Sequence, residues 1–236
     1  IALQLPELTP TKTVARFPAY LVELLAFDGI AAVSEDSAAA LTEYWRWLGA
    51  PQPPPVRAIP LGVDLPAAAS PHPGPPPADH AVVLSVGSIE GRKNHLALLE
   101  ACERLWAGGA HFTLHLIGLA HPQTGAAALQ RIRELQSAGR ALRYEGPATD
   151  AGLEDAYARC TFTVYPSLHE GFGLPVIESL VHGKPCICSA RGALGESARG
   201  GGCLPLERVG AEELAAAIGR LLRAPAEIET LAAAAR

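Results

Sequence analysis

From residue 81 onward, unbroken apolar segments with strand character alternate with segments of helical spacing. Apolar runs of this kind are typical of strands that are buried on both faces of a parallel sheet. The alternation predicts an α/β fold, a doubly wound parallel sheet of the Rossmann-like type, which binds ligands at the carboxyl ends of its strands. The expected strands are 81–87, 112–118, 141–146, 161–166 and 185–189, and the expected helices are 94–109, 125–139, 151–160, 174–182 and 211–223.

The chain divides into three parts. Residues 1–64 contain helical and strand-like segments of their own, and residues 81–236 contain the regular alternation. Between them, residues 65–80 are rich in proline and predict an extended linker. Because the chain starts at Ile1 and contains no methionine, we expect it to be a piece of a longer protein.

Composition argues against several classes of function. A formal net charge of −5 and a pI of about 5.9 disfavour general affinity for nucleic acids. No apolar run approaches the roughly 20 residues of a membrane span, and no signal-peptide pattern opens the chain. The five cysteines do not have the spacing of metal ligands. We expect them to be core residues of a protein in a reducing compartment. Cys186 and Cys188 are expected to face opposite ways on one strand, which argues against zinc.

The stretch YPSLHEGFGLPVIESL leaves the carboxyl end of a predicted strand and enters a helix. Gly171 and Gly173 let the backbone approach a ligand closely, and Pro175 suits the first helical position. The free N–H groups at the helix start form an anion site. Glu178, one turn into the helix, and Glu170, before the glycines, can accept hydrogen bonds from hydroxyls on either side. A nucleotide sugar would fit such a site, because its diphosphate lies between two groups that carry hydroxyls, the ribose and the hexose.

This stretch resembles the E-x7-E motif of the retaining glycosyltransferases of the GT-B fold, in particular glycosyltransferase family 4 (group 1). SVGSIEGRKNHLALLEAC, AVSEDSAAALTEY and VRAIPLGVD are similar to other passages of that family, in the family's order. The resemblance covers the chain from about Asp28 to Leu222. It implies that residues 1–64 are a remnant of the amino-terminal GT-B domain with the inter-domain crossover. Residues 81–236 would be the nucleotide-sugar-binding, C-terminal half.

The resemblance also assigns roles to single residues. It implies that Glu170 contacts the transferred sugar and takes part in catalysis, and that Glu178 holds the ribose. Ser88 departs from the family, since some members have an arginine there. The donor-binding residues that it implies are the basic pair for the diphosphate, Arg92 and Lys93, the phosphate cradle, Gly171, Phe172, Gly173 and Leu174, the ribose ligand Glu178, and Gly146 in the loop beside the base.

The function implied by the resemblance is transfer of a hexose, of the mannosyl type among others, from a nucleoside diphosphate sugar to a glycan or lipid-linked acceptor with retention. The acceptor site would lie in a missing amino-terminal domain, so this chain would be inactive alone. No metal or other cofactor is implied, because the sequence has no Asp-x-Asp pair. The parent protein would act in bacterial polysaccharide synthesis in the cytoplasm, at the inner face of the membrane, without nucleic acid.

Other functions stay open at this point. The chain could be a non-catalytic nucleotide-sugar-binding or interaction module. Another GT-B enzyme, such as a sugar-nucleotide epimerase or a phosphorylase, would share the architecture, although Lys184 is a poor match for a phosphorylase lysine that binds pyridoxal phosphate. A dinucleotide oxidoreductase is disfavoured, because no G-x-G-x-x-G follows the first strand.

Several residues have ordinary structural interpretations. His169 lies beside Glu170, but a loop histidine is more often exposed or stacked than catalytic. His115 is expected to be a core residue with a satisfied ring, and Trp45 and Trp47 are expected to serve packing. Glu196 either corresponds to a recurring glutamate of the family or caps a short helix.

Overall fold

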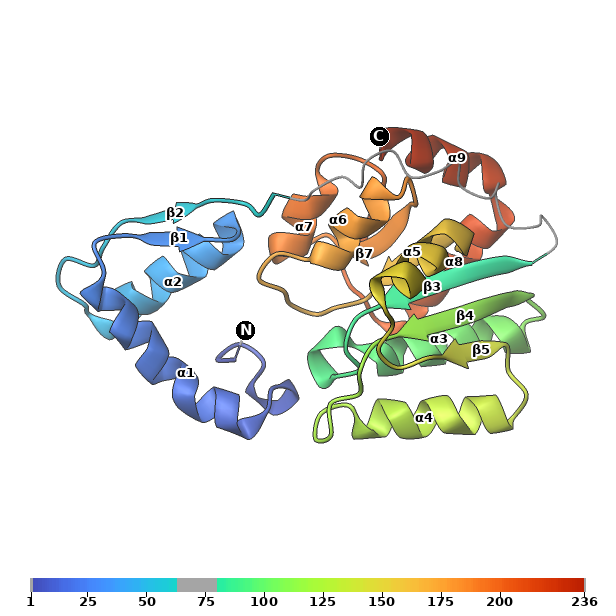
Figure 1. Ribbon diagram of the computed structural model, residues 1–236, viewed down its shortest axis with the longest axis horizontal. Coiled ribbons are helices and arrows are strands. Elements are labelled where there is room, and N and C mark those ends of the chain that lie inside the picture. The colour runs from blue at the N-terminus through green and yellow to red at the C-terminus, as the bar shows by residue number, and fades with distance from the viewer. Residues whose placement is uncertain (1, 63–79, 236) are drawn as a thin grey trace.

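The centre of the fold is a six-stranded parallel sheet with the strand order β5-β4-β3-β6-β7-β8 (Figure 1). The computed structural model describes residues 2–62 and 80–235, so the predicted linker lies outside the described residues except at its last position. The predicted doubly wound α/β sheet is confirmed. Its strands are β3 (Ala81–Val86), β4 (Phe112–Ile117), β5 (Leu142–Tyr144), β6 (Phe162–Tyr165), β7 (Cys186–Ser189) and β8 (Cys203–Leu206), the last of which the sequence had not indicated.

Helices cover both faces of this sheet, with α3 and α4 on one side and α5 and α6 on the other (Figure 1). Neighbouring strand residues alternate between the faces: Val83 packs with α3, α4 and α8, whereas Leu84 packs with α5. This alternation explains why the strands are apolar throughout. The helices are α3 (His95–Ala107), α4 (Ala126–Ser137), α5 (Asp150–Arg159), α6 (Leu174–Val181), α7 (Gly192–Ala198), α8 (Ala211–Arg223) and α9 (Pro225–Ala234).

The strand order reverses at β3. From β3 the chain continues outward through β4 and β5, and then returns to place β6 against the other side of β3. In open parallel sheets, the crevice at the carboxyl ends of two such strands is where ligands bind. The loops that follow β3 and β6 therefore meet at the place where a site is expected.

All five cysteines are buried and free. Cys186, Cys188 and Cys203 pack in one apolar cluster with α6 and α7. The expectation that Cys186 and Cys188 face opposite ways was wrong, because residues two apart on a strand point to the same face. All three side chains are buried in that cluster, as expected for core cysteines.

The amino-terminal part is a small unit of helices and two short parallel strands (Figure 1). Trp45 is fully buried, and its Nε1 donates a hydrogen bond to the Leu21 carbonyl at 2.8 Å. Trp47 is 78% exposed, so the packing role expected for it was wrong. No helix in residues 2–62 or 80–235 is both long and apolar enough to span a bilayer. The elements are η1 (Pro6–Leu8), α1 (Thr11–Glu23), η2 (Leu24–Ala26), β1 (Ile30–Ala32), α2 (Glu35–Leu48) and β2 (Val56–Ala58).

The start of α2 is bound to the larger part of the chain by hydrogen bonds. The Glu196 carboxylate on α7 accepts from the backbone N–H groups of Glu35 and Asp36, at 2.9 and 2.7 Å. The Ser34 hydroxyl donates to the Gly171 carbonyl at 2.7 Å. Glu196 thus caps a helix, but not the short one expected, since α2 is 14 residues long and lies about 160 residues earlier in the sequence.

Candidate functional site

The loops after β3 and β6 meet at the reversal of strand order. The loop after β3 contains the short 3-10 helix η3 (Gly91–Lys93), and the loop after β6 runs from residue 166 to 173. The Arg92 carbonyl accepts a hydrogen bond from the Leu168 amide at 2.9 Å, and the Asn94 side chain donates to the Pro166 carbonyl at 3.2 Å. These contacts bring together two sequence motifs that are more than 70 residues apart.

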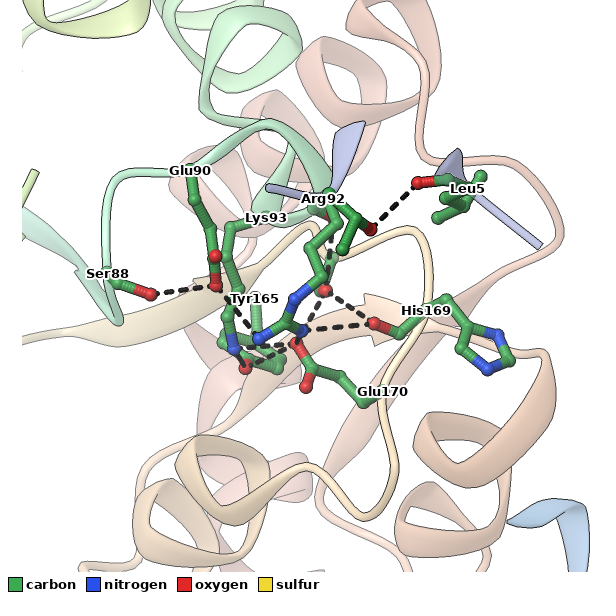
Figure 2. Close-up of polar contacts among 10 residues, drawn as sticks. Leu5, Ser88, Glu90, Arg92, Lys93, Tyr165, His169 and Glu170 are labelled. Atoms are coloured by element: carbon green, nitrogen blue, oxygen red, sulfur yellow. Dashed lines mark hydrogen bonds and ion pairs between the residues drawn. The ribbon is translucent and has the colours of Figure 1, made fainter. Parts of the chain in front are cut away.

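One oxygen of Glu170 is the centre of a buried polar cluster (Figure 2). Glu170 Oε1 lies 2.6 Å from Lys93 Nζ and 2.8 Å from Arg92 Nη1. It also accepts hydrogen bonds from the Tyr165 hydroxyl at 2.8 Å and the Ser167 hydroxyl at 2.6 Å. Glu170 Oε2 makes no hydrogen bond to any described residue. The carboxylate therefore holds both cations with one oxygen and keeps the other for a further partner.

The ionisation of this cluster follows from burial and charge. Burial alone would raise the pKa of Glu170, but Lys93, Ser167 and Arg92 outweigh it and hold that pKa below its usual value. Burial lowers the pKa of Lys93 although Glu170 opposes the shift. Lys93 and Glu170 are only 8% and 9% exposed, so the two charges depend on each other for solvation.

A second carboxylate, Glu90, completes the charge balance. Glu90 Oε1 lies 2.8 Å from Arg92 Nη2 and accepts a hydrogen bond from the Ser88 hydroxyl at 2.9 Å. Two cations and two carboxylates therefore neutralise each other in this structure (Figure 2). The sequence analysis missed Glu90, although its place two residues before Arg92 in the motif IEGRK was visible.

The amino end of α6 lies directly after Glu170. Gly173 has a φ of +101°, and a Cβ there would lie 2.5 Å from Leu194 Cδ2, so only glycine fits. Gly171 has no such φ, and its Cβ would meet nothing closer than 3.7 Å. Of the two predicted positions, glycine is thus required at Gly173 but not at Gly171. Pro175 is the second helical residue and not the first, since α6 begins at Leu174.

The backbone around this helix start is arranged by other elements. The Ser197 hydroxyl donates to the Phe172 carbonyl at 3.0 Å, and Ser34 and Ser37 donate to the Gly171 carbonyl. The carbonyls of Gly171 and Phe172 are thus held by hydrogen bonds. The amides of Gly173 and Leu174 have no hydrogen-bond partner among the described residues. Unpaired amides at a helix start form an anion site.

Glu178 lies on α6 and belongs to a separate contact. Its Oε2 accepts a hydrogen bond from the Tyr157 hydroxyl at 3.0 Å, and the Tyr157 ring stacks on His182 with 4.7 Å between ring centroids. Burial and the Glu178 charge raise the pKa of Tyr157, which keeps the phenol protonated as a donor. No described contact joins Glu178 to the cluster around Glu170. The structure therefore places the two glutamates in different surroundings.

Gly146 belongs to a row of glycines at the ends of three strands. Its carbonyl accepts a hydrogen bond from the Gly118 amide at 2.7 Å. A Cβ at Gly118, which follows β4, would lie 1.9 Å from the carbonyl oxygen of Gly87, which follows β3. The sequence analysis named Gly146 but missed Gly87 and Gly118, although the first three predicted strands all end in glycine. Together they leave the positions at the carboxyl ends of β3, β4 and β5 without side chains.

The two histidines that the sequence analysis considered have distinct surroundings. The His169 carbonyl accepts a hydrogen bond from Arg92, but its imidazole points away from the Glu170 cluster (Figure 2). Burial lowers the pKa of that imidazole. His115 on β4 is buried, with its Nε2 3.0 Å from Glu145 Oε1, which confirms a core residue with a satisfied ring.

Residues 80–224, more than half of the chain, match the family described as Glycosyl transferases group 1. The chain belongs to this family. A serotype-specific mannosyltransferase of Escherichia coli, WbdA, is 30% identical over 169 residues, which cover 66% of this chain and 20% of WbdA. The O-antigen chain mannosyltransferase B of Escherichia coli is 35% identical over 107 residues, which cover 45% of this chain and 28% of that protein. The chain thus spans about a fifth to a quarter of the length of these relatives.

Solved structures of glycosyltransferases share the fold. Sucrose-phosphate synthase from Thermosynechococcus elongatus superimposes with a TM-score of 0.73 at 26% identity, over 94% of this chain and 56% of that one. Anabaena Alr3699/HepE, solved in complex with UDP and glucose, gives a TM-score of 0.77 at 18% identity, over 97% of this chain and 63% of that one. Both matches support assignment of the fold to the GT-B class.

Proposed function

We propose that this chain is the donor-binding part of a retaining glycosyltransferase, which transfers a hexose from a nucleoside diphosphate sugar to a glycan or lipid-linked acceptor. One observation carries the proposal: Arg92 and Lys93 meet Glu170 directly before the amino end of α6. The place where the strand order reverses thus contains two cations, a carboxylate with a free oxygen and unpaired helix amides. The mannosyltransferases among the relatives favour a hexose of the mannose type.

Donor binding would exchange partners within this cluster. The diphosphate oxygens would take Arg92 and Lys93 from the carboxylates that now hold them, because charge-assisted hydrogen bonds to phosphate are short and strong. The α6 amides would bind a further phosphate oxygen. Glu178 would accept hydrogen bonds from the ribose hydroxyls, and the loop at Gly146 would pack against the base.

The chemical step would rest on electrostatics. The bond between the anomeric carbon and the diphosphate oxygen breaks, and its electron pair leaves with the diphosphate. Arg92 and Lys93 stabilise that negative charge, while ionised Glu170 stabilises the positive charge on the sugar. The acceptor hydroxyl attacks the face that the diphosphate leaves and gives its proton to the departing diphosphate, so the configuration is retained. No metal and no protein nucleophile enters this scheme.

A thermal-shift screen with UDP, GDP and ADP tests the proposal. A nucleotide that binds the folded chain at 100 times its Kd stabilises it by about 2.7 kcal/mol. We expect at least one of the three to raise the Tm. The absence of any shift at millimolar concentrations would contradict a donor site on this chain.

We expect Arg92→Ala to weaken nucleoside diphosphate binding by roughly 10- to 150-fold, because it removes a charge-assisted hydrogen bond. Binding of the matching nucleoside should change little, and the salt dependence of diphosphate binding should decrease. Calorimetry with both ligands measures the effect. Arg104→Ala is the matched control, since Arg104 is an exposed arginine on α3 that pairs with Glu100. Equal losses for nucleoside and diphosphate would show that Arg92 acts structurally.

We expect Glu178→Ala to weaken nucleoside and nucleoside diphosphate binding alike, by about tenfold or more, because both ligands contain the ribose. Tyr157→Phe should have a smaller effect in the same direction, since it removes only the hydroxyl that holds Glu178 in place. Calorimetric titration of both variants provides the measurement. If Glu178→Ala left nucleoside affinity unchanged, the ribose role would be refuted.

A further inference from the structure

A cavity lies beside η3, with Glu90 and Gly91 among its lining residues. Its volume is about 600 Å³, which is within the range of small-molecule sites. η1, η3, the start of α3 and the segment before α4 form its walls. Leu8 of η1 packs against Gly91, where a Cβ would lie only 3.1 Å from Leu8 Cδ2. The wall between the amino-terminal segment and η3 is therefore tightly packed.

Two residues that line this cavity each contain a buried polar atom without a partner among the described residues. His95 lines the cavity at 3% exposure, and its Nδ1 makes no hydrogen bond within the described chain. Thr124 lines the same cavity, and its Oγ1 is also buried without a partner. A buried polar atom without a hydrogen bond costs about 1–3 kcal/mol, so such atoms are rare in native proteins unless a ligand or water binds them. Two of them in one cavity indicate a binding site.

The charge of the cavity restricts what can bind there. Glu7 and Glu90 line it, and no lysine or arginine is among its described lining residues. Burial and the nearby Lys93 charge lower the pKa of His95 to about 4, so this ring is neutral at physiological pH. Glu90 is already paired with Arg92, so an anionic ligand would be repelled mainly by Glu7, and the described lining offers it no cation. A neutral ligand rich in hydroxyls fits, because hydroxyls can donate to Glu7 and also pair with His95 and Thr124.

The cavity also offers apolar surface. Leu8, Leu96 and Leu168 line it, and the last two are 49% and 40% exposed. Sugars combine hydroxyl edges with C–H faces, so a lining of leucines between polar groups suits a pyranose ring better than a strongly polar ion.

The position of the cavity connects it to the proposed donor site. Glu90 and Gly91 face the cavity, whereas Arg92 and Lys93, the next two residues of the same turn, bind Glu170. Leu168, two residues before Glu170, lines the cavity as well. One turn therefore separates the cavity from the cations proposed to hold the donor diphosphate.

From these observations we propose that the cavity is an acceptor subsite for a neutral, unphosphorylated saccharide. This inference rests on the proposed function, and it places part of the acceptor site on this chain, where the sequence analysis had expected it in another domain. The charge of the lining selects an uncharged sugar over a sugar phosphate.

Saturation-transfer NMR with two probes tests the inference. We expect methyl α-D-mannopyranoside to bind the wild-type chain, and mannose 6-phosphate to bind at least fivefold more weakly. Thr124→Val keeps the shape of the side chain and removes the unpaired hydroxyl, so it should reduce mannoside binding at least fivefold without lowering the Tm. His95→Leu should reduce mannoside binding in the same way. Thr42→Val on α2 is the control, since that hydroxyl already donates to the Ala38 carbonyl.

Nucleoside diphosphate binding is measured on the same samples to separate the two proposals. It should stay within twofold of wild type in Thr124→Val. If nucleotide binds but the mannoside does not, the subsite is refuted and the donor site stands. If neither binds, both proposals fall. Tighter binding of mannose 6-phosphate than of the mannoside, or mannoside binding that both variants leave intact, would also overturn the inference.

Discussion

Replacing Glu170 by glutamine is expected to lower the free energy of unfolding by about 3–5 kcal/mol in the absence of nucleotide. The change keeps the shape of the side chain but removes the only described carboxylate that pairs with the buried Lys93 ammonium. An unpaired buried charge is strongly destabilising, whereas an exposed pair contributes little. Urea unfolding of Glu170→Gln measures the loss. Glu100→Gln, which breaks an exposed pair with Arg104, is the matched control and should behave like wild type.

The effect of Glu170→Gln should depend on pH and on ligand. Because the folded-state pKa of Glu170 lies below the ordinary value of 4.5, its contribution to stability is present above that value and is lost as the pH falls through the folded pKa. The difference in free energy of unfolding between wild type and Glu170→Gln should therefore decrease at acidic pH. Saturating nucleoside diphosphate should also reduce it, since phosphate would replace the carboxylate beside Lys93. Equal stability of both proteins at pH 7 would show that the buried pair contributes nothing.

Gly173→Ala is expected to cost about 1–3 kcal/mol from its backbone conformation alone, because φ is +101° there. The overlap of the new Cβ with Leu194 Cδ2, at 2.5 Å, adds to this cost. The variant should also bind nucleoside diphosphate more weakly, since the clash moves the α6 amides. Thermal unfolding and calorimetry measure the two losses.

Gly171→Ala is the internal control for that substitution. Gly171 lies two residues earlier in the same loop, without a left-handed φ and with 3.7 Å of space to the nearest side-chain atom. We expect it to fold with nearly wild-type stability. Similar losses at both positions would mean that glycine is needed for loop flexibility and not for the conformation seen at Gly173.

The fold was predictable because local patterns specify it. Strands buried on both faces must be apolar throughout, so they stand out in the sequence from 81 onward, and their glycine ends mark the site edge. The short strand β8 was not predicted, because Pro205 within it and Gly201–Gly202 before it are typical of a loop. Trp47 was misjudged because a tryptophan on an amphipathic helix gives no sign of which face is covered.

The site was predictable in its residues but not in their pairing. The resemblance assigns Arg92, Lys93 and Glu170 to different parts of a ligand, whereas the structure joins them in one buried cluster. Lys93 and Glu170 are 77 residues apart, and only the meeting of the β3 and β6 loops brings them into contact. Tyr165 and Ser167 lie only five and three residues before Glu170, but the sequence gives no sign of which side chains of this segment turn toward one another.

The row of Gly87, Gly118 and Gly146 has a consequence for protein engineering. A ligand base that rests on this edge would meet backbone only, and any side chain at Gly118 would overlap the Gly87 carbonyl oxygen. A substitution at Gly118 would damage the sheet without creating a new contact to a base, whereas a Cβ at Gly146 would meet nothing within 4 Å. A change of nucleotide preference therefore has to be designed away from Gly118, at Gly146 or in the surrounding loops, whose length and sequence can vary without disturbing the strands.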